Sequence, residues 1–337
     1  MGITTILAPN NSFPEYASVG LHINFGSADE TPAQRGQAHL LEHLLVRSHF
    51  PRSLALKAST GRERTSFQMV TKVGDINRTI EALARVIHHR IRITPETLVE
   101  EKGIVAREIA ERHQSMSWRV REAAFNALWE GTSYSYDPLG TVADLMNLGP
   151  SSLSRTLEQQ YLPGNAVLVI AGESRLKDQL VTTGWPNRLP LTKRRATLPQ
   201  SPRLVRLRWN QEELGHVLAW SDSAAQSRAR LVNRMGEAKF QQLALREGWL
   251  TWVWVPPSSE PKMTVESQLS ATLSALSESK SSVLSEYRCD EIKRCEQVEA
   301  TAQDAIDRLW AGPGRSAPLS LADGLEHWRS FVQKVRA

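Results

Sequence analysis

The stretch His39-Leu40-Leu41-Glu42-His43 decides how the first half of this chain is interpreted. Successive residues of an α-helix are 100° apart, so His39, Glu42 and His43 share one face. Residues four apart lie about 5–6 Å from each other at Cβ, which lets two imidazoles reach one zinc ion at about 2.0–2.1 Å. Glu42 would then be placed to accept a proton from a water on the metal. The opposite face is apolar and can anchor the helix in a core, through Leu40, Leu41, Leu44 and Leu45.

An ordinary amphipathic helix is the alternative interpretation of this pentapeptide. The chain contains nine histidines among its 337 residues, so the spacing also arises by chance. His39, Glu42 and His43 would then form a solvated face with no chemical role. The surrounding sequence has to distinguish the two interpretations.

The composition is that of a globular protein with two domains. At 337 residues the chain exceeds a comfortable single domain, and 41% hydrophobic with 23% charged residues argues against disorder. The net charge of +5 is mild, and no basic block is interleaved with aromatic residues, so we expect no nucleic-acid partner. No apolar run approaches the length of a membrane span, so we expect no membrane partner either.

The N-terminal residues and the cysteines predict a cytoplasmic protein. Residues 1–13 lack the basic segment and apolar core of an export signal. Cys289 and Cys295 lie on an expected helix and make a poor disulfide pair, which is typical of a reducing compartment.

Strands and helices are interleaved in the first half of the chain. The apolar patterns predict a helix after Gly36 and a hairpin around Gly61, with strands at residues 58–60 and 65–73. Further strands are expected at residues 4–8, 17–25 and 166–172, and further helices at 75–90, from Thr94 onward, 119–129, 141–147 and 151–160. This order predicts an α+β domain over residues 1–190.

Two glutamates on the helix that begins near Thr94 are candidate parts of a metal site. Glu101 and Glu108 are two turns apart and flank the same apolar stripe. Solvated charges are the usual fate of glutamate, but a partly buried carboxylate needs a counter-ion. Since two imidazoles leave a zinc site short of a third ligand, either glutamate could complete it.

The second half repeats the order of elements in shorter form. A linker rich in proline and basic residues is expected at 185–203. Strands are predicted at 205–209, 216–222, 249–255 and 262–269, with a long helix at 227–247 and helices to the end. We therefore expect two tandem related α+β domains, each a mostly antiparallel sheet with helices packed on it. The second, at residues 203–337, is shortened and has no metal-spacing motif.

Several motifs, taken in order, resemble the pitrilysin (insulinase) family of zinc metallopeptidases. The resemblance covers most of residues 1–175 and, more faintly, 205–337. Its motifs are Gly26-Ser27 with Glu30, Gly36 before the His39–His43 pentapeptide, Ala58 to Phe67 with its alternating threonines, the pair Glu101 and Glu108, residues 136–140 and residues 161–165.

The resemblance implies a role for each site residue. His39, His43 and Glu108 would bind Zn²⁺, Glu42 would be the general base, and Glu101 would accept a hydrogen bond from a ligating imidazole. An extended peptide substrate would add as a β-strand along Lys57, Ala58, Ser59 and Thr60, and Arg246 of the second domain would contact it. Two positions depart from the family pattern. Lys57 stands where asparagine is usual, and Trp252 or Trp254 stands where the family has a tyrosine hydroxyl.

The resemblance predicts a zinc endopeptidase that cleaves peptides or unstructured segments, in the manner of a precursor-processing protease. The alternative is a non-catalytic subunit that binds peptides or forms the scaffold of a processing complex. A chain of this length closes only half of a peptide-enclosing chamber, so a partner subunit of the same fold is expected. A distinct subunit, giving a heterodimer, is favoured over a homodimer.

Overall fold

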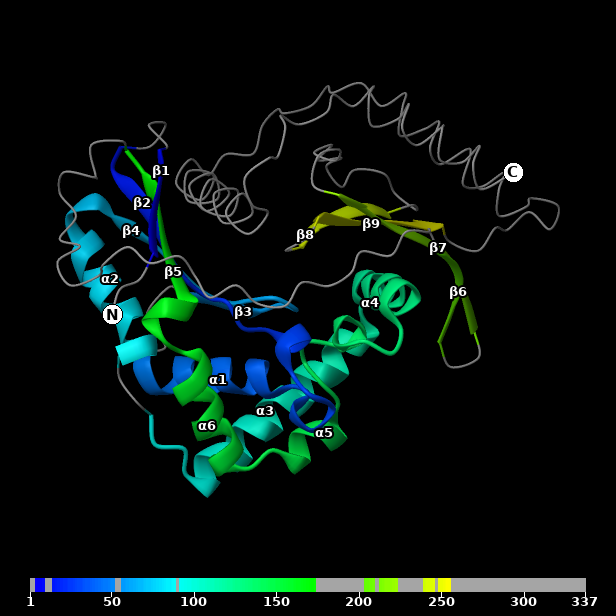
Figure 1. The fold of residues 1–337 in the computed structure, drawn as a ribbon, viewed down its shortest axis with the longest axis horizontal. Helices are drawn as coiled ribbons and strands as arrows, with labels where there is room; N and C mark the ends of the chain where they lie inside the picture. Colours follow the sequence, from blue (N-terminus) through cyan, green and yellow to red (C-terminus); the bar gives the residue numbers. More distant parts are fainter. Residues whose placement is uncertain are drawn as a thin grey trace. The chain divides into compact units, whose positions relative to one another are not determined.

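A computed structural model describes residues 4–9, 14–51, 56–88, 91–173, 203–209, 212–223, 239–245 and 248–255. Within these ranges the elements fall into two compact units. The first unit contains the described residues up to Gln114 and residues 132–173, and the second contains residues 115–131 with the later strands. Figure 1 labels the elements of both units.

The first unit is built on a five-stranded sheet with the order β1-β5-β2-β4-β3 (Figure 1). Its strands are β1 (Thr4–Pro9), β2 (Tyr16–Ile23), β3 (Leu56–Thr60), β4 (Thr65–Lys72) and β5 (Ala166–Gly172). Only β1 and β5 pair in parallel, and all other neighbours are antiparallel. The predicted α+β class with a mostly antiparallel sheet is thus confirmed.

The burial of the strands follows their sequences. Every residue of β5 is buried, and β2 is buried from Ala17 to its end, so both strands are covered on both faces. Their residues are apolar or small, apart from the buried His22, whose Nδ1 lies 2.8 Å from Ser66 Oγ. At the edge of the sheet, β3 alternates instead, with Lys57 and Ser59 exposed. The outer side of β3 therefore has backbone groups without a neighbouring strand of this sheet.

Two helices, α1 (Gln37–His49) and α2 (Ile76–His88), pack on the sheet, and α3 (Pro95–Gln114) packs on α1. The shorter helices α5 (Val142–Asn147) and α6 (Pro150–Gln160) follow. All four leucines of the predicted apolar face of α1 are buried. His39 and Glu42, on its other face, are also buried, at 5% and 7% exposure, so the solvated-face interpretation of the pentapeptide is wrong.

The start of α1 is held in place by the side chain of Glu30 and by two glycines. Glu30 accepts hydrogen bonds from the backbone N–H groups of Gly36 (2.9 Å) and Ala38 (2.7 Å), which have no partner within the helix. Gly36 has φ +78° and Gly140 has φ +70°, and a Cβ on Gly140 would lie 2.8 Å from Gly36 Cα. Only glycine fits this close backbone contact at positive φ. These contacts explain why Glu30, Gly36 and Gly140 recur among the resemblance motifs.

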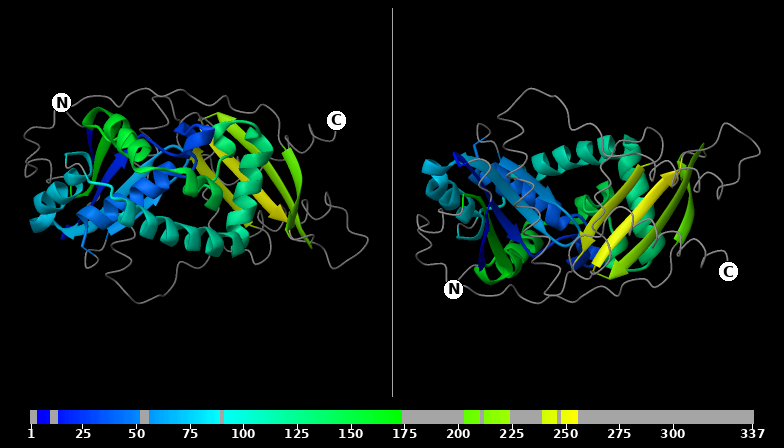
Figure 2. Two further views of the ribbon diagram at one scale, coloured as in Figure 1. Left: turned by 90° about the horizontal axis from the view of Figure 1, so that it is seen from below. Right: turned by 90° about the horizontal axis from the view of Figure 1, so that it is seen from above.

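The second unit is a four-stranded antiparallel sheet in the order β6-β7-β9-β8, with α4 (Met116–Trp129) packed on it (Figure 2). Its strands are β6 (Arg203–Trp209), β7 (Glu212–Ser223), β8 (Lys239–Leu245) and β9 (Gly248–Val255). The helix contributes Phe125 to the interior, and the sheet contributes Val217, Leu250 and Trp252, all buried. The strands predicted at 205–209, 216–222 and 249–255 are confirmed.

Two expectations differ from the structure. The predicted helix at 227–247 is wrong for residues 239–245, which form β8 and pair along β9. The segment Lys239–Leu245 has good helix formers, but pairing with the β-rich neighbour β9 outweighs this local preference. The helix at 119–129, assigned to the first domain, groups with the second sheet as α4. The linker at 185–202, the strand at 262–269 and the C-terminal helices lie outside the described residues.

Candidate metal centre

Three side chains from two helices converge on one point in the first unit. Glu108 Oε2, from α3, lies 3.5 Å from His39 Nε2 and 3.4 Å from His43 Nε2, both from α1. One ligand atom from each residue lies within 4.8 Å of the others. The imidazole rings are 4.7 Å apart and almost perpendicular, at 82°. The sequence-predicted trio is therefore brought together.

The geometry and charge of this trio fit a zinc ion. Ligands about 2.0–2.1 Å from a tetrahedral metal lie roughly 3.4 Å apart, close to the two separations to Glu108. Burial and the neighbouring His43 lower the pKa of His39 to about 4, so this imidazole is neutral at pH 7. The hydrogen bond from His43 lowers the pKa of Glu108 to about 2, although burial acts in the opposite direction. Burial lowers the pKa of His43, but Glu108, Glu42 and Glu101 outweigh it and raise that pKa overall, so a metal would displace a proton from this imidazole. Neutral imidazole and ionised carboxylate are the forms that bind metals, and three protein ligands leave the fourth position open.

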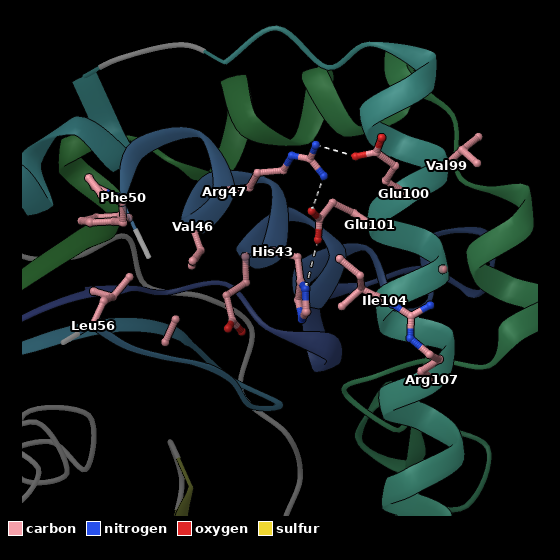
Figure 3. A pocket seen from close by; sticks show the side chains of 14 residues that line it. His43, Val46, Arg47, Phe50, Leu56, Val99, Glu100, Glu101, Ile104 and Arg107 are labelled. Carbon is pink, nitrogen blue, oxygen red and sulfur yellow. Dashed lines mark hydrogen bonds and ion pairs between the residues drawn. The ribbon is translucent and has the colours of Figure 1, made fainter. Parts of the chain in front are cut away.

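A second carboxylate orients His43 from its other nitrogen. Glu101 Oε2 lies 3.3 Å from His43 Nδ1, and Glu101 Oε1 accepts a hydrogen bond from Arg47 Nη1 at 3.0 Å (Figure 3). Arg47 also pairs with Glu100 at 2.5 Å. Glu101 is 4% exposed, and a buried carboxylate needs a counter-ion. Arg47 supplies it. A proton on Nδ1, directed to Glu101, leaves Nε2 available to a metal.

Sequence reasoning missed Arg47, although a signal was present. Arg47 lies four residues after His43, on the same face of α1. At that spacing it reaches the carboxylate that His43 contacts, so its position on the helix pointed to Glu101.

Glu42 lies beside the trio without belonging to it. Its Oε2 accepts a hydrogen bond from Thr60 Oγ1 at 2.6 Å. Burial raises the pKa of Glu42 to about 7, although this hydrogen bond acts in the opposite direction. A general base works best with a pKa near the working pH, and Glu42 meets that condition.

A cavity of about 1030 Å³ opens beside Glu42 and His43 (Figure 3). It lies between α1, α3 and β3, and Ala58 of β3 lines it. Its wall combines polar and apolar side chains, with Arg107 and Arg47 among the lining residues, and the labelled apolar side chains include Val46, Phe50, Leu56 and Ile104. An extended chain that runs along β3 could place one side chain in this cavity.

The predicted substrate-binding residues have different positions. Lys57 and Ser59 are exposed on β3, while Ala58 and Thr60 are half-buried. The Thr60 side chain has a partner that the sequence did not suggest, since its hydroxyl is directed to Glu42. Arg246 lies outside the described residues.

The two tryptophans of β9 were predicted at the place of the family's tyrosine. Trp252 is 2% exposed, and Trp254 Nε1 donates to Leu214 O at 2.8 Å within the same sheet.

No described helix is long and apolar enough to cross a membrane.

Comparisons with known proteins find similarity to peptidases. Residues 5–142 match the family model of the insulinase family (peptidase family M16). The uncharacterised zinc protease YmxG of Bacillus subtilis (strain 168) is 26% identical over 188 residues, which are 51% of this chain and 46% of that protein. Mitochondrial-processing peptidase subunit beta of Caenorhabditis elegans is 24% identical over 178 residues, 49% of this chain and 39% of that protein. The chain spans less than half the length of these curated relatives.

Solved structures show the same fold. A protease from Helicobacter pylori superposes with a TM-score of 0.62 at 15% identity, covering 98% of this chain and 94% of that one. A peptidase M16 inactive domain from Pseudomonas fluorescens also gives 0.62, at 11% identity, covering 99% and 89%. These identities establish the fold alone. The match of residues 5–142, which contain the whole trio, Glu42 and Glu101, supports membership of this part of the chain in the pitrilysin/insulinase family, peptidase family M16.

Proposed function

We propose that this chain is a zinc-dependent endopeptidase that cleaves peptides or unstructured segments. The observation that carries the proposal is the convergence of His39, His43 and Glu108, with their ligand atoms within 4.8 Å of one another beside the buried carboxylate of Glu42. Zinc bound there would polarise a substrate carbonyl and acidify water.

The side chains around this point would have different roles in the reaction. Glu42 would accept a proton from the attacking water and return it to the amine that leaves. Glu101 and Arg47 would hold His43 in the tautomer that directs Nε2 to the site. Of these residues, Glu42 alone would exchange protons with the substrate.

The edge strand β3 would position the substrate. It has no strand on its outer side in the five-stranded sheet, so a peptide could pair with residues 57–60 by backbone hydrogen bonds. Such pairing demands an extended substrate and supports a preference for flexible segments. The cavity lined by Ala58, Val46 and Ile104 would receive one side chain of that peptide.

We further propose a partner subunit of the same fold, and favour a distinct chain over a second copy. The argument is chemical, because the tryptophans of β9 offer no hydroxyl to stabilise a developing oxyanion, and loss of one such donor costs about 10²–10³-fold in rate. A homodimer remains the alternative, since two-fold pairs are the commonest assemblies. A cytoplasmic location remains a prediction from the sequence.

The test uses the purified full chain and an unstructured peptide. We expect about one zinc per chain by elemental analysis, loss of cleavage on chelation and its return with added zinc. A chain that binds no zinc would contradict the proposal. Light scattering on the same sample tests the partner. If the chain is monomeric and cleaves at a rate that an added partner does not raise, no second subunit is needed.

A non-catalytic, peptide-binding subunit is the second candidate. The fold does not discriminate, because both a protease and an inactive domain share it. The same assay does, because a non-catalytic subunit would retain zinc or peptide without cleaving it, even with a partner present.

A further inference from the structure

The hydroxyl of Thr60 is held against the carboxylate of Glu42. Thr60 is the last residue of the edge strand β3 and Glu42 is on α1, and their side-chain oxygens are 2.6 Å apart. Glu42 is buried and Thr60 is half-buried. Among the described residues, Thr60 is the hydrogen-bond partner recorded for this carboxylate. The contact joins the strand that would take the substrate to the residue that would move the proton.

Counting protons shows that the Thr60 hydroxyl is fully used. A threonine hydroxyl has one proton to donate. The nearby Thr65 Oγ1 donates its own proton to Phe25 O at 3.0 Å, and its 3.4 Å separation from Thr60 Oγ1 is long for a hydrogen bond between hydroxyls. Ionised Glu42 can only accept, so Thr60 gives its proton to Oε2 and has none left for a substrate.

This arrangement makes the two carboxylate oxygens of Glu42 different from each other. Oε2 is occupied by Thr60, while Oε1 has no hydrogen bond within the described part of the chain. When one oxygen of a carboxylate is fixed by a hydrogen bond, the other oxygen points in a defined direction. A single hydrogen bond from a strand therefore orients a side chain that would otherwise rotate about its terminal bond.

We propose that Thr60 is a positioning residue, which fixes the Glu42 carboxylate so that Oε1 faces the reacting water. The inference rests on the proposed peptidase function. It assigns the Thr60 hydroxyl to Glu42, where the sequence had predicted a contact with the substrate. The backbone of Thr60 remains available to a paired peptide. Docking of a substrate strand on β3 and orientation of the base are then coupled through one residue.

The test compares Thr60→Val, which removes the hydroxyl at nearly constant shape, with Thr60→Ser, which keeps it. Thr71→Val is the matched control, since Thr71 is half-buried in the neighbouring strand β4 and has no contact with the site. The assay uses the full chain, with its partner if one is required, and an unstructured peptide. We expect Thr60→Val to lower kcat about 10–100-fold, because a misplacement of about 1 Å can cost about 10²-fold. In Thr60→Val, KM and zinc content should stay near the wild-type values. In Thr60→Ser and Thr71→Val, kcat, KM and zinc content should all stay near the wild-type values.

Two kinetic results would overturn the inference. A rise in KM with unchanged kcat in Thr60→Val would assign the hydroxyl to substrate binding. An equal loss in Thr60→Ser would show that the methyl group and its packing matter, and the hydroxyl does not.

Crystal structures of the zinc-loaded wild type and Thr60→Val separate this inference from the proposed function. We expect the Glu42 carboxylate to leave its position in Thr60→Val and to keep it in Thr60→Ser. If it keeps its position in both variants, Thr60 does not hold it. If the wild type cleaves no peptide, the proposed function fails, and the crystal structures alone then decide whether Thr60 positions Glu42.

Discussion

The two helices that form the candidate metal centre, α1 and α3, differ in how they are held. α1 is buried on both faces, with leucines against the core and His39 and Glu42 covered as well. α3 buries one stripe, made of Leu98, Glu101, Val105 and Ile109, and leaves the Glu108 side chain 28% exposed. Packing therefore encloses α1 from Gln37 to Glu42, whereas α3 contributes Glu101 from its buried stripe and Glu108 from the margin of that stripe. Substitution of the partly exposed Glu108 of α3 should therefore remove the metal with little effect on folding, whereas substitution of Glu42 of α1 should separate catalysis from metal binding.

Glu108→Gln is expected to have the largest effect on this comparison, because it should remove zinc and peptide cleavage together. The amide has no charge to offset the metal, and the half-exposed position leaves the fold intact. Elemental analysis and circular dichroism measure the two properties. Glu111→Gln, an exposed neighbour on the same helix, is the control and should retain zinc. Stoichiometric zinc in Glu108→Gln would assign the third ligand to another residue.

Glu42→Gln should separate the two functions of α1. We expect cleavage to fall by about 10²–10⁴-fold, the usual cost of losing a general base, while zinc stays bound to His39, His43 and Glu108. Turnover and metal content are measured on one preparation. Near-normal turnover would show that Glu42 is not the base.

Glu101→Gln should have an intermediate effect, since it changes the partner of a ligand and keeps the ligand itself. Outer partners of metal ligands typically contribute about 10–100-fold in metal affinity or activity. The adjacent Glu100→Gln is the comparison, because Glu100 contacts the same Arg47 but has no contact with His43. Zinc affinity is measured by competition with a chelator. Equal losses in the two variants would mean that the salt bridges to Arg47, and not the contact with His43, account for the effect.

Glu30→Gln should give the smallest effect, seen in the pH dependence of stability. Burial raises the pKa of Glu30 to about 8 from 4.5, although the hydrogen bonds from Ala38 and Gly36 act against it. The folded chain then keeps a proton that the unfolded chain releases, so the free energy of unfolding should fall as pH rises from 4.5 to about 8.

Denaturant unfolding with a chelator present, at several pH values, tests this prediction. Glu30→Gln should show a weaker decline than the wild type across that window. Glu81→Gln, an exposed carboxylate on α2, should keep the wild-type decline. The same decline in Glu30→Gln would show that other groups cause it.

Local patterns in the sequence determined much of this protein. The spacing of His39, Glu42 and His43 put them on one helical face, and the leucines opposite them predicted the buried side of α1. Period-two and apolar runs located the strands of the first sheet. These signals are readable because they depend on residues within one or two turns of each other.

Only the tertiary structure decided which distant groups meet. Spacing alone left Glu101 and Glu108 as equal candidates, and the packing of α3 on α1 gave Glu108 to the two Nε2 atoms and Glu101 to His43 Nδ1. The contact of Thr60 with Glu42 joins an edge strand to a helix and has no signal in either segment. At Lys239–Leu245, pairing with β9 overrode a helical preference. The physical reason is common to all three, because side-chain partners and strand neighbours are set by the packing of separate elements, which local periodicity does not encode.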